Sequence, residues 1–446
     1  MSDADPRNLL DDLIARARRA GADAADALMV ESASLSLARR LGKPEKLERA
    51  ESQDLGLRVL IGKRQAIVSS SDRAPAILDE LVERAVAMAR SVPEDPYCGL
   101  ASPDEIDRHP PQLELNDPAE PTPEALAERA SAAEEAARAI PGVTNSEGAE
   151  AGWSRSRVAM AASNGFAGAY EGSRHGVSVS VIAGNGTGME RDYDYSSAVF
   201  EADLTDAAEV GRKAGERAVA RLGPRKVATT KVPVVFDPRV SGGLLGHLAG
   251  AINGSAIARG TSFLKDKLGQ QVMASGLTVT DDPYRARGLR SRPFDGEGIA
   301  CRRRDIVADG VLTTWVLDLR SARQLDLKST GHAGRGTSSP PAPGPTNLFL
   351  APGTLSRDAL IGGIDRGFYV TELIGFGVNG ITGDYSRGAA GFWIEGGRLA
   401  YPVSEVTIAG NLKEMFLHMT PADDLVFRHG TDAPTVRIDG LTIAGT

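Results

Sequence analysis

Hydrophobic and polar residues alternate with two different periods in the first part of the chain. Apolar residues recur at helical spacing between Pro6 and Gly21, which predicts a first helix. Residues 27–39 and 54–70 alternate between apolar and polar positions, a pattern typical of strands with one buried face. Residues 62–64, Gly-Lys-Arg, interrupt the second stretch and predict a hairpin turn.

A second block with a similar order of elements follows a proline-rich stretch. Residues 92–122 contain seven prolines, which predicts a linker or extended arm rather than a core element. Helical periodicity flanks this arm and also closes the second block, predicting helices over 75–90, 123–139 and 203–222. Strand-like segments lie between the last two helices, at 155–162, 166–171 and 176–184.

The two blocks share short matching segments. The segment that begins at Glu51 and continues with Gly56-Leu57-Arg58-Val59 recurs from Glu171 with Gly176-Val177-Ser178-Val179, and Glu-Arg-Ala-Val-Ala occurs at 83–87 and 216–220. The two matches differ in offset, so the comparison requires an insertion. We favour a diverged internal repeat, because element order and residues agree. The alternative is two α+β blocks that merely share common helix formers.

From Val232 onward short strands and glycine turns dominate. A helix of very small residues is predicted over 241–260 and is expected to be deeply packed. Two further short helices are predicted, near 319–328 and 357–364. The pattern predicts an α+β chain in two parts: an N-terminal α+β domain, 1–225, which contains a doubled unit if the repeat is real, and a C-terminal mainly β domain, 226–446, of sandwich or barrel-like form.

Composition and charge exclude several classes of function. The 446 residues carry a net charge of −8 and have no Lys/Arg-rich run, so a nucleic-acid partner lacks its usual electrostatic signature. Cys98 and Cys301 are too few and too far apart to predict a disulfide framework. No signal-peptide run and no stretch of 18 apolar residues occur, so we expect a cytoplasmic protein without a membrane partner.

Common catalytic motifs are absent from the sequence, and one apparent nucleotide-binding motif is followed by the wrong type of secondary structure. GFGVNG, at 375–380, matches the dinucleotide fingerprint, but the residues after it are strand-like, whereas that fingerprint requires a helix. The chain has no G-x-S-x-G, no P-loop and no H-E-x-x-H. Of six histidines, His247 lies in the small-residue helix, where we expect a hydrogen-bonded core histidine rather than a metal ligand.

Long blocks of the chain resemble the PmbA/TldE branch of the TldD/PmbA peptidase family. The C-terminal blocks are the most specific: 241–272, 295–312, 329–335, 380–416 and 433–445. LGLRVLIG at 55–62 and the segment 162–184 fit the same family, so the resemblance covers nearly the whole chain.

In the TldD branch of this family, the corresponding helix carries H-E-x-x-x-H, which binds zinc and activates water, and a late cysteine adds a ligand. Alignment on the preceding Leu-Leu places Gly246, His247 and Ala251 at those three positions, and no cysteine follows Cys301, although His429 lies in the late stretch. A catalytic zinc requires three protein ligands. The resemblance therefore implies no catalytic residue, metal ligand or cofactor on this chain.

The resemblance also implies the partners. It predicts a non-catalytic, PmbA/TldE-like subunit of a TldD/TldE-type heterodimeric metalloprotease, in which a TldD-like subunit bears the zinc and unfolded peptides or small proteins are hydrolysed. Whether the chain forms homodimers when that partner is absent stays open. Two alternatives stay open: a self-sufficient metallopeptidase with an unpredicted metal site, to which His247 or His429 contributes, and a binding scaffold independent of any protease.

Overall fold

The first half of the chain forms one long antiparallel sheet with helices on one of its faces. The computed structural model describes residues 6–445, and the sheet order is β3-β2-β1-β4-β5-β6. The strands are β1 (Ala24–Arg40), β2 (Lys43–Ile61), β3 (Arg64–Ser70), β4 (Val143–Ala162), β5 (Ala167–Ala183) and β6 (Glu190–Ala198). The helices are α1 (Pro6–Arg19), α2 (Pro75–Ser91), α3 (Pro123–Arg138) and α4 (Ala207–Ala220).

The order of these elements confirms the doubled unit predicted from the sequence. Each unit runs helix, three strands, helix: α1-β1-β2-β3-α2 and then α3-β4-β5-β6-α4. The two units join where β1 pairs with β4, so the sheet order is symmetric about that pair. Gly56 lies in β2 and Gly176 lies in β5, the middle strands of the two units.

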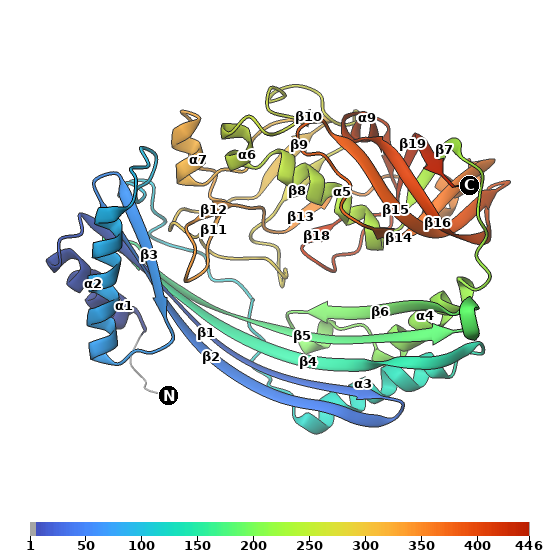
Figure 1. Ribbon diagram of the computed structural model, residues 1–446, viewed down its shortest axis with the longest axis horizontal. Helices are drawn as coiled ribbons and strands as arrows, with labels where there is room; N and C mark the ends of the chain where they lie inside the picture. The colour runs from blue at the N-terminus through green and yellow to red at the C-terminus, as the bar shows by residue number, and fades with distance from the viewer. Residues whose placement is uncertain (1–5, 446) are drawn as a thin grey trace.

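Each pair of helices covers its own end of the sheet. Alternate residues of β1 point toward the helices, because side chains along a strand alternate between its faces. Ala27 packs in the cluster under α1 and α2, and Leu35 and Leu37 pack in the cluster under α3 and α4. Figure 1 shows the sheet arching below the C-terminal half, with α3 and α4 on its far side.

The strands of the second unit are longer than the sequence pattern predicted. The segments predicted at 166–171 and 176–184 form one continuous strand, β5, and the segment predicted at 155–162 is only the end of β4. Gly172 and Gly176 interrupt the apolar alternation, but the backbone ladder to β4 continues through both residues. Only one face of this sheet is packed against helices, so polar and glycine positions on the other face do not end the strand.

The proline-rich segment 92–122 contains no regular helix or strand and contacts both halves of the molecule. Ile106 forms an isolated bridge with Ile299 of the C-terminal half. Further along, the backbone N–H of Ser173, in β5, donates to the carbonyl of Leu115 at 2.8 Å. The segment is therefore an ordered arm that lies between the two halves.

The C-terminal half is built on a closed sheet, which confirms its predicted barrel-like form. The strand order is β16-β15-β14-β7-β19-β17, and β16 also pairs with β19, which closes five of the strands into a barrel. These strands are β7 (Thr230–Phe236), β14 (Arg366–Ile374), β15 (Asp384–Glu395), β16 (Arg398–Asn411), β17 (Met419–Pro421) and β19 (Val436–Ala444).

A second, smaller sheet and several short helices complete this half. The sheet order is β10-β9-β8-β13-β18. Its strands are β8 (Val279–Asp281), β9 (Arg304–Ala308), β10 (Val311–Leu312), β13 (Leu348–Leu350) and β18 (Thr431–Asp432), and β11 (Ala333–Gly334) pairs with β12 (Ala342–Pro343). The helices are α5 (Pro238–Ala251), α6 (Gly254–Ala258), α7 (Leu319–Gln324), α8 (Arg357–Gly362) and α9 (Leu412–Leu417). Between residues 6 and 445, no helix combines the length and apolar character needed to cross a bilayer.

The small-residue helix differs from its prediction in two respects. The helix predicted over 241–260 is two helices, because Asn253 leaves the helical path: its side chain caps α6 by accepting from the N–H of Ser255. The helix is also not deeply packed on all sides. Leu244, Leu245 and Leu248 are buried in the core of the C-terminal half, but Gly243, Gly246 and Gly250 are exposed.

Candidate functional site

Helix α5 is held so that one face points away from the hydrophobic core. Asp237 caps its N-terminus, where the carboxylate accepts from the N–H of Arg239 at 2.9 Å and from the Tyr369 hydroxyl at 2.6 Å. The leucines at positions 244, 245 and 248 anchor the opposite side in the core. Gly246 and Gly250 therefore lie on the outer face, and an added Cβ at either position would meet nothing within 4 Å.

A cavity of about 350 Å³ lies against this face of α5, at the positions that correspond to the zinc-binding motif of the TldD branch. Four parts of the C-terminal half form it: α5, the segment after α6, the loop between β14 and β15, and β15 with the start of α9. The lining residues are Gly246, His247, Gly250, Ala251, Thr261, Phe263, Phe376, Val378, Gly380, Arg387 and Leu412. All three degenerate motif positions are thus brought to one cavity.

His247 lines this cavity without the hydrogen bond expected of a core histidine. Its ring is partly buried and packs edge-on against Tyr385, with 5.9 Å between ring centroids. No hydrogen bond within residues 6–445 uses either of its ring nitrogens. Burial and the positive charge of Arg387 lower the pKa of His247, so the imidazole is held neutral at physiological pH. The expectation of a hydrogen-bonded core histidine is therefore wrong, because the outer face of α5 is open.

Tyr385 and Arg387 are brought to His247 by the two-residue period of β15. Side chains two residues apart on a strand share a face, and this face of β15 is turned toward α5. The Tyr385 ring is buried, which raises its pKa to about 12, and its hydroxyl has no hydrogen-bond partner within the described chain. Arg387 Nε donates to the carbonyl of Ile374 at 3.3 Å.

The cavity lining does not supply the ligands of a catalytic zinc. Such a site needs three protein ligands and an open position for water. Among the eleven lining residues, His247 is the one side chain of a usual zinc-ligand type, and no aspartate, glutamate or cysteine is present. Across residues 6–445, no group of three or more His, Cys, Asp or Glu side chains is placed to hold a metal ion.

His429 lies in different surroundings from His247. Its ring packs on Tyr195 of β6, with 5.3 Å between centroids, and its Nδ1 lies 2.7 Å from the tyrosine hydroxyl. It is absent from the lining of the cavity at α5. The structure therefore does not bring these two histidines together as joint ligands.

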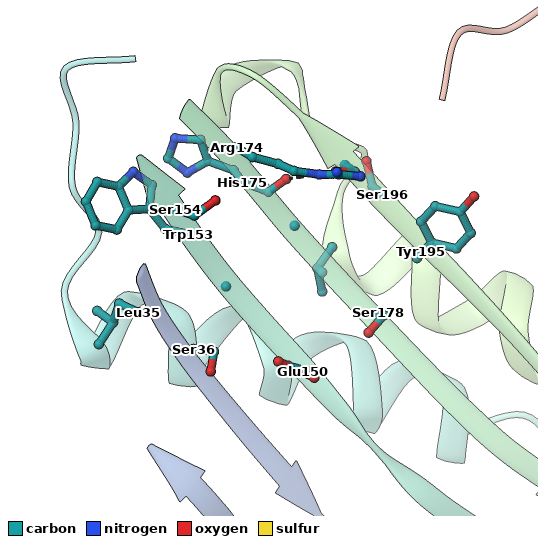
Figure 2. A pocket seen from close by; sticks show the side chains of 14 residues that line it. Leu35, Ser36, Glu150, Trp153, Ser154, Arg174, His175, Ser178, Tyr195 and Ser196 are labelled. Atoms are coloured by element: carbon teal, nitrogen blue, oxygen red, sulfur yellow. Dashed lines mark hydrogen bonds between the residues drawn. The ribbon is translucent and has the colours of Figure 1, made fainter. Parts of the chain in front are cut away.

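A second hollow, of about 360 Å³, lies on the N-terminal sheet (Figure 2). Small polar side chains from neighbouring strands line it, among them Ser36 of β1, Ser154 of β4 and Ser178 of β5. They belong to the sheet face opposite the one that packs on α3 and α4, since Leu35 and Leu37 face those helices. This face is turned toward the C-terminal half (Figure 1).

Two features of the candidate site were not predicted from the sequence: the placement of Tyr385 and Arg387 near His247, and the exposure of Phe376 at the cavity. Arg387 lies within the block 380–416 that resembles the family, but the cavity that it lines depends on residues from four separate segments. The period-2 spacing of Tyr385 and Arg387 was a usable signal, because it places both on one face of a strand. The residues 375–380 are followed by β15 and not by a helix, and Phe376 is 98% exposed at the cavity.

Comparisons with known proteins give consistent matches along the chain. Three family models match, described as PmbA/TldA metallopeptidase domain 1 over residues 25–89, the central domain over 116–222, and the C-terminal domain over 229–445. The chain is 40% identical over 425 residues to Metalloprotease PmbA of Escherichia coli O157:H7, covering 95% of this chain and 92% of that protein. It is 36% identical over 432 residues to a PmbA homolog of Haemophilus influenzae, covering 96% and 94%.

Solved structures share the whole fold. A candidate modulator of DNA gyrase from Bacteroides thetaiotaomicron VPI-5482 superposes with a TM-score of 0.92 at 29% identity, and all of both chains is covered. TldE from Thermococcus kodakarensis superposes with a TM-score of 0.89 at 22% identity, covering 98% of this chain and 100% of that one. At that identity, the likeness to TldE concerns the fold alone.

Proposed function

Because this chain belongs to the PmbA/TldD metallopeptidase family, we propose that it is the PmbA/TldE-type subunit of a two-component zinc metallopeptidase. In this proposal a TldD-like subunit carries the zinc and the catalytic glutamate. The present chain completes the assembly without performing the chemical step. The substrates are unstructured peptides or small unfolded proteins, and the complex works in the cytoplasm.

The observation that carries this proposal is the cavity at α5. The barrel, the helix and a cavity against it are all present, yet the three motif positions are Gly246, His247 and Ala251 and offer one imidazole. Water activation by zinc needs a metal held by three ligands with a base beside it. A chain that keeps the fold but not these groups is best suited to a structural role in the complex.

The N-terminal sheet supports a role in enclosing the substrate. Its inner face carries short polar side chains and glycines, including Ser36, Gly152 and Gly176. The serines and glycines leave backbone close to any bound chain, beside the larger side chains of Glu150, Arg174 and Tyr195. Peptides bound through their main chain are recognised with little dependence on sequence. We therefore assign this face to the wall of the reaction chamber.

The first test is reconstitution of peptidase activity from separate proteins. This chain and a TldD-like protein carrying H-E-x-x-x-H are assayed on an unstructured peptide, alone and mixed, with and without a chelator. We expect efficient cleavage by the mixture only, loss of activity with the chelator, and loss when the motif glutamate of the TldD-like protein is changed to glutamine.

Three outcomes would contradict the proposal. If the TldD-like protein cleaves equally well without this chain, the role of a required subunit is wrong. If this chain cleaves alone and elemental analysis finds one tightly held zinc per chain, it is a self-sufficient metallopeptidase. If the two proteins do not associate in size-exclusion chromatography, a scaffold independent of the protease explains the fold better.

A further inference from the structure

The cavity at α5 carries positive charge without a matching negative group. Its lining includes the cationic Arg387 and the neutral imidazole of His247, and no carboxylate. Two other partly buried arginines, in contrast, are paired with carboxylates: Arg221 Nη2 lies 2.6 Å from Glu372 Oε2, and Arg239 Nη1 lies 2.6 Å from Asp192 Oδ1. Arg387 has no carboxylate within ion-pair distance among residues 6–445, and its assigned hydrogen bond, from Nε to a carbonyl, leaves the two terminal nitrogens available.

A second group behind the cavity also lacks a partner. Tyr385 is 2% exposed and its hydroxyl makes no hydrogen bond to any part of the described chain. A buried polar group without a partner costs free energy, commonly about 1–3 kcal/mol. The positive charge of Arg387 acts on the pKa of both His247 and Tyr385, so the three polar side chains occupy one small region. The Tyr385 hydroxyl and the terminal nitrogens of Arg387 are hydrogen-bond donors without an acceptor in the described chain. Because Arg387 is positively charged, an anionic acceptor would suit this region best.

The rest of the cavity is apolar. Phe263, Val378, Leu412 and the 98% exposed Phe376 line the other sides. Its volume, about 350 Å³, lies at the lower end of the roughly 300–1,000 Å³ typical of small-ligand pockets. A fitting ligand therefore has one anionic end and a compact apolar body, a description that inorganic phosphate does not meet.

We propose that this cavity binds the C-terminal carboxylate of a peptide that ends in an apolar residue. The Arg387 guanidinium holds the carboxylate through charge-assisted hydrogen bonds, which are stronger than neutral ones. The His247 imidazole lies beside it, and the terminal side chain packs between Phe263 and Phe376. This inference rests on the proposed function, because the products of peptide hydrolysis carry such carboxylates, and it deepens that function by assigning the degenerate motif a recognition role.

The test is binding of a minimal ligand to the full chain, measured by isothermal titration calorimetry. N-acetyl-L-phenylalanine carries the carboxylate and the apolar side chain, and N-acetyl-L-phenylalanine amide is its neutral counterpart. We expect saturable binding of the acid, with the amide at least tenfold weaker. Arg387→Gln should weaken binding of the acid at least tenfold. Arg398→Gln, a change at an exposed arginine outside the cavity, should leave it unchanged.

A second readout follows the histidine itself. A bound carboxylate favours the charged imidazolium, so the pKa of His247, measured by NMR, should rise when the acid is present and should not rise with the amide. Equal affinity for acid and amide, undiminished binding by the Arg387→Gln protein, or no saturable binding would each overturn the inference. Because this assay needs no TldD-like protein, it can fail while the reconstitution assay succeeds, and the two proposals are judged separately.

Discussion

Glu297 is a fully buried carboxyl group at the junction between the two halves. Its Oε2 accepts from the backbone N–H of Leu319 at 2.8 Å, and the carboxyl of Asp295 lies close by. Burial, together with the negative charge of Asp295, raises the pKa of Glu297 from its ordinary 4.5 to about 8. Protonation of this carboxyl is therefore linked to folding.

The sign of this linkage predicts lower stability at higher pH. Below pH 4.5 the folded and unfolded states both hold the proton, so the free energy of unfolding does not change with pH through Glu297. Between pH 4.5 and about 8, the unfolded chain releases the proton while the folded chain keeps it, so the stability contributed by the protonated group is progressively lost. We expect the free energy of unfolding to fall across this range through Glu297.

Glu297→Gln tests this expectation, because glutamine cannot ionise and retains an oxygen that can accept from Leu319. The decrease in stability between pH 5 and pH 8.5, measured by urea unfolding, should be smaller in this variant than in the parent protein. Glu80→Gln, at an exposed position, is the control and should follow the parent. Parallel curves for all three proteins would show that Glu297 is already ionised in the fold.

The matching glycines of the two N-terminal units, Gly56 and Gly176, have different surroundings. Gly56 in β2 approaches the C-terminal half so closely that an added Cβ would lie 2.0 Å from the carbonyl oxygen of Thr337. At Gly176 in β5, the nearest atom to an added Cβ is the carbonyl oxygen of Ser196 at 3.6 Å, an ordinary contact. The same position therefore forms a docking contact in the first unit and an open surface in the second.

Alanine at these two positions should have opposite effects on stability. Gly56→Ala must displace the backbone at Thr337, and we expect a loss of about 1–3 kcal/mol in the free energy of unfolding. Gly176→Ala removes backbone freedom without a clash and should be neutral or stabilising by up to about 1 kcal/mol. Urea unfolding of both variants measures the difference. Equal effects would mean that the segment at Thr337 moves away from β2 at little cost.

The two halves of the molecule are joined by a buried ion triad. Asp26 of β1 accepts from Arg58 Nε at 2.9 Å and from Arg335 Nη1, which comes from the C-terminal half, at 2.6 Å. All three side chains are at most 3% exposed. Burial alone would raise the pKa of Asp26, but the two guanidiniums hold it below its ordinary value. A buried apolar cluster with residues from both halves, including Leu28 and Phe294, extends the same junction.

Removal of Asp26 should destabilise the whole molecule. Asp26→Ala leaves two buried guanidinium groups without their anion, and breaking a buried pair in this way costs about 3–5 kcal/mol. Lys226→Ala, which breaks an exposed pair with Glu405, is the matched control and should lower the free energy of unfolding far less than Asp26→Ala does. Urea unfolding compares the two, and similar losses would indicate that water enters the junction and replaces the carboxylate.

Local patterns in the sequence accounted for most elements of the fold. Helical spacing of apolar residues located the helices near 75–90 and 123–139, which the structure places at Pro75–Ser91 and Pro123–Arg138. The recurring Gly56 and Gly176 segments indicated the doubled unit, because two copies of one fold keep the same periodic pattern of buried positions. The degenerate motif at Gly246, His247 and Ala251 could also be identified, since alignment depends only on residue order.

The tertiary structure determined which segments of the chain lie next to each other. The barrel closes because β16 pairs with β19, and Arg387 lines the same cavity as His247, although these residues are far apart in the chain. The exposure of the glycine face of α5 also depends on which segments pack against this helix. Periodicity reports only whether a position is buried, and it does not identify the segment that covers it. For this reason the sequence predicted a buried, hydrogen-bonded His247, whereas packing of the leucines on the opposite side of α5 turned it toward an open, cationic cavity.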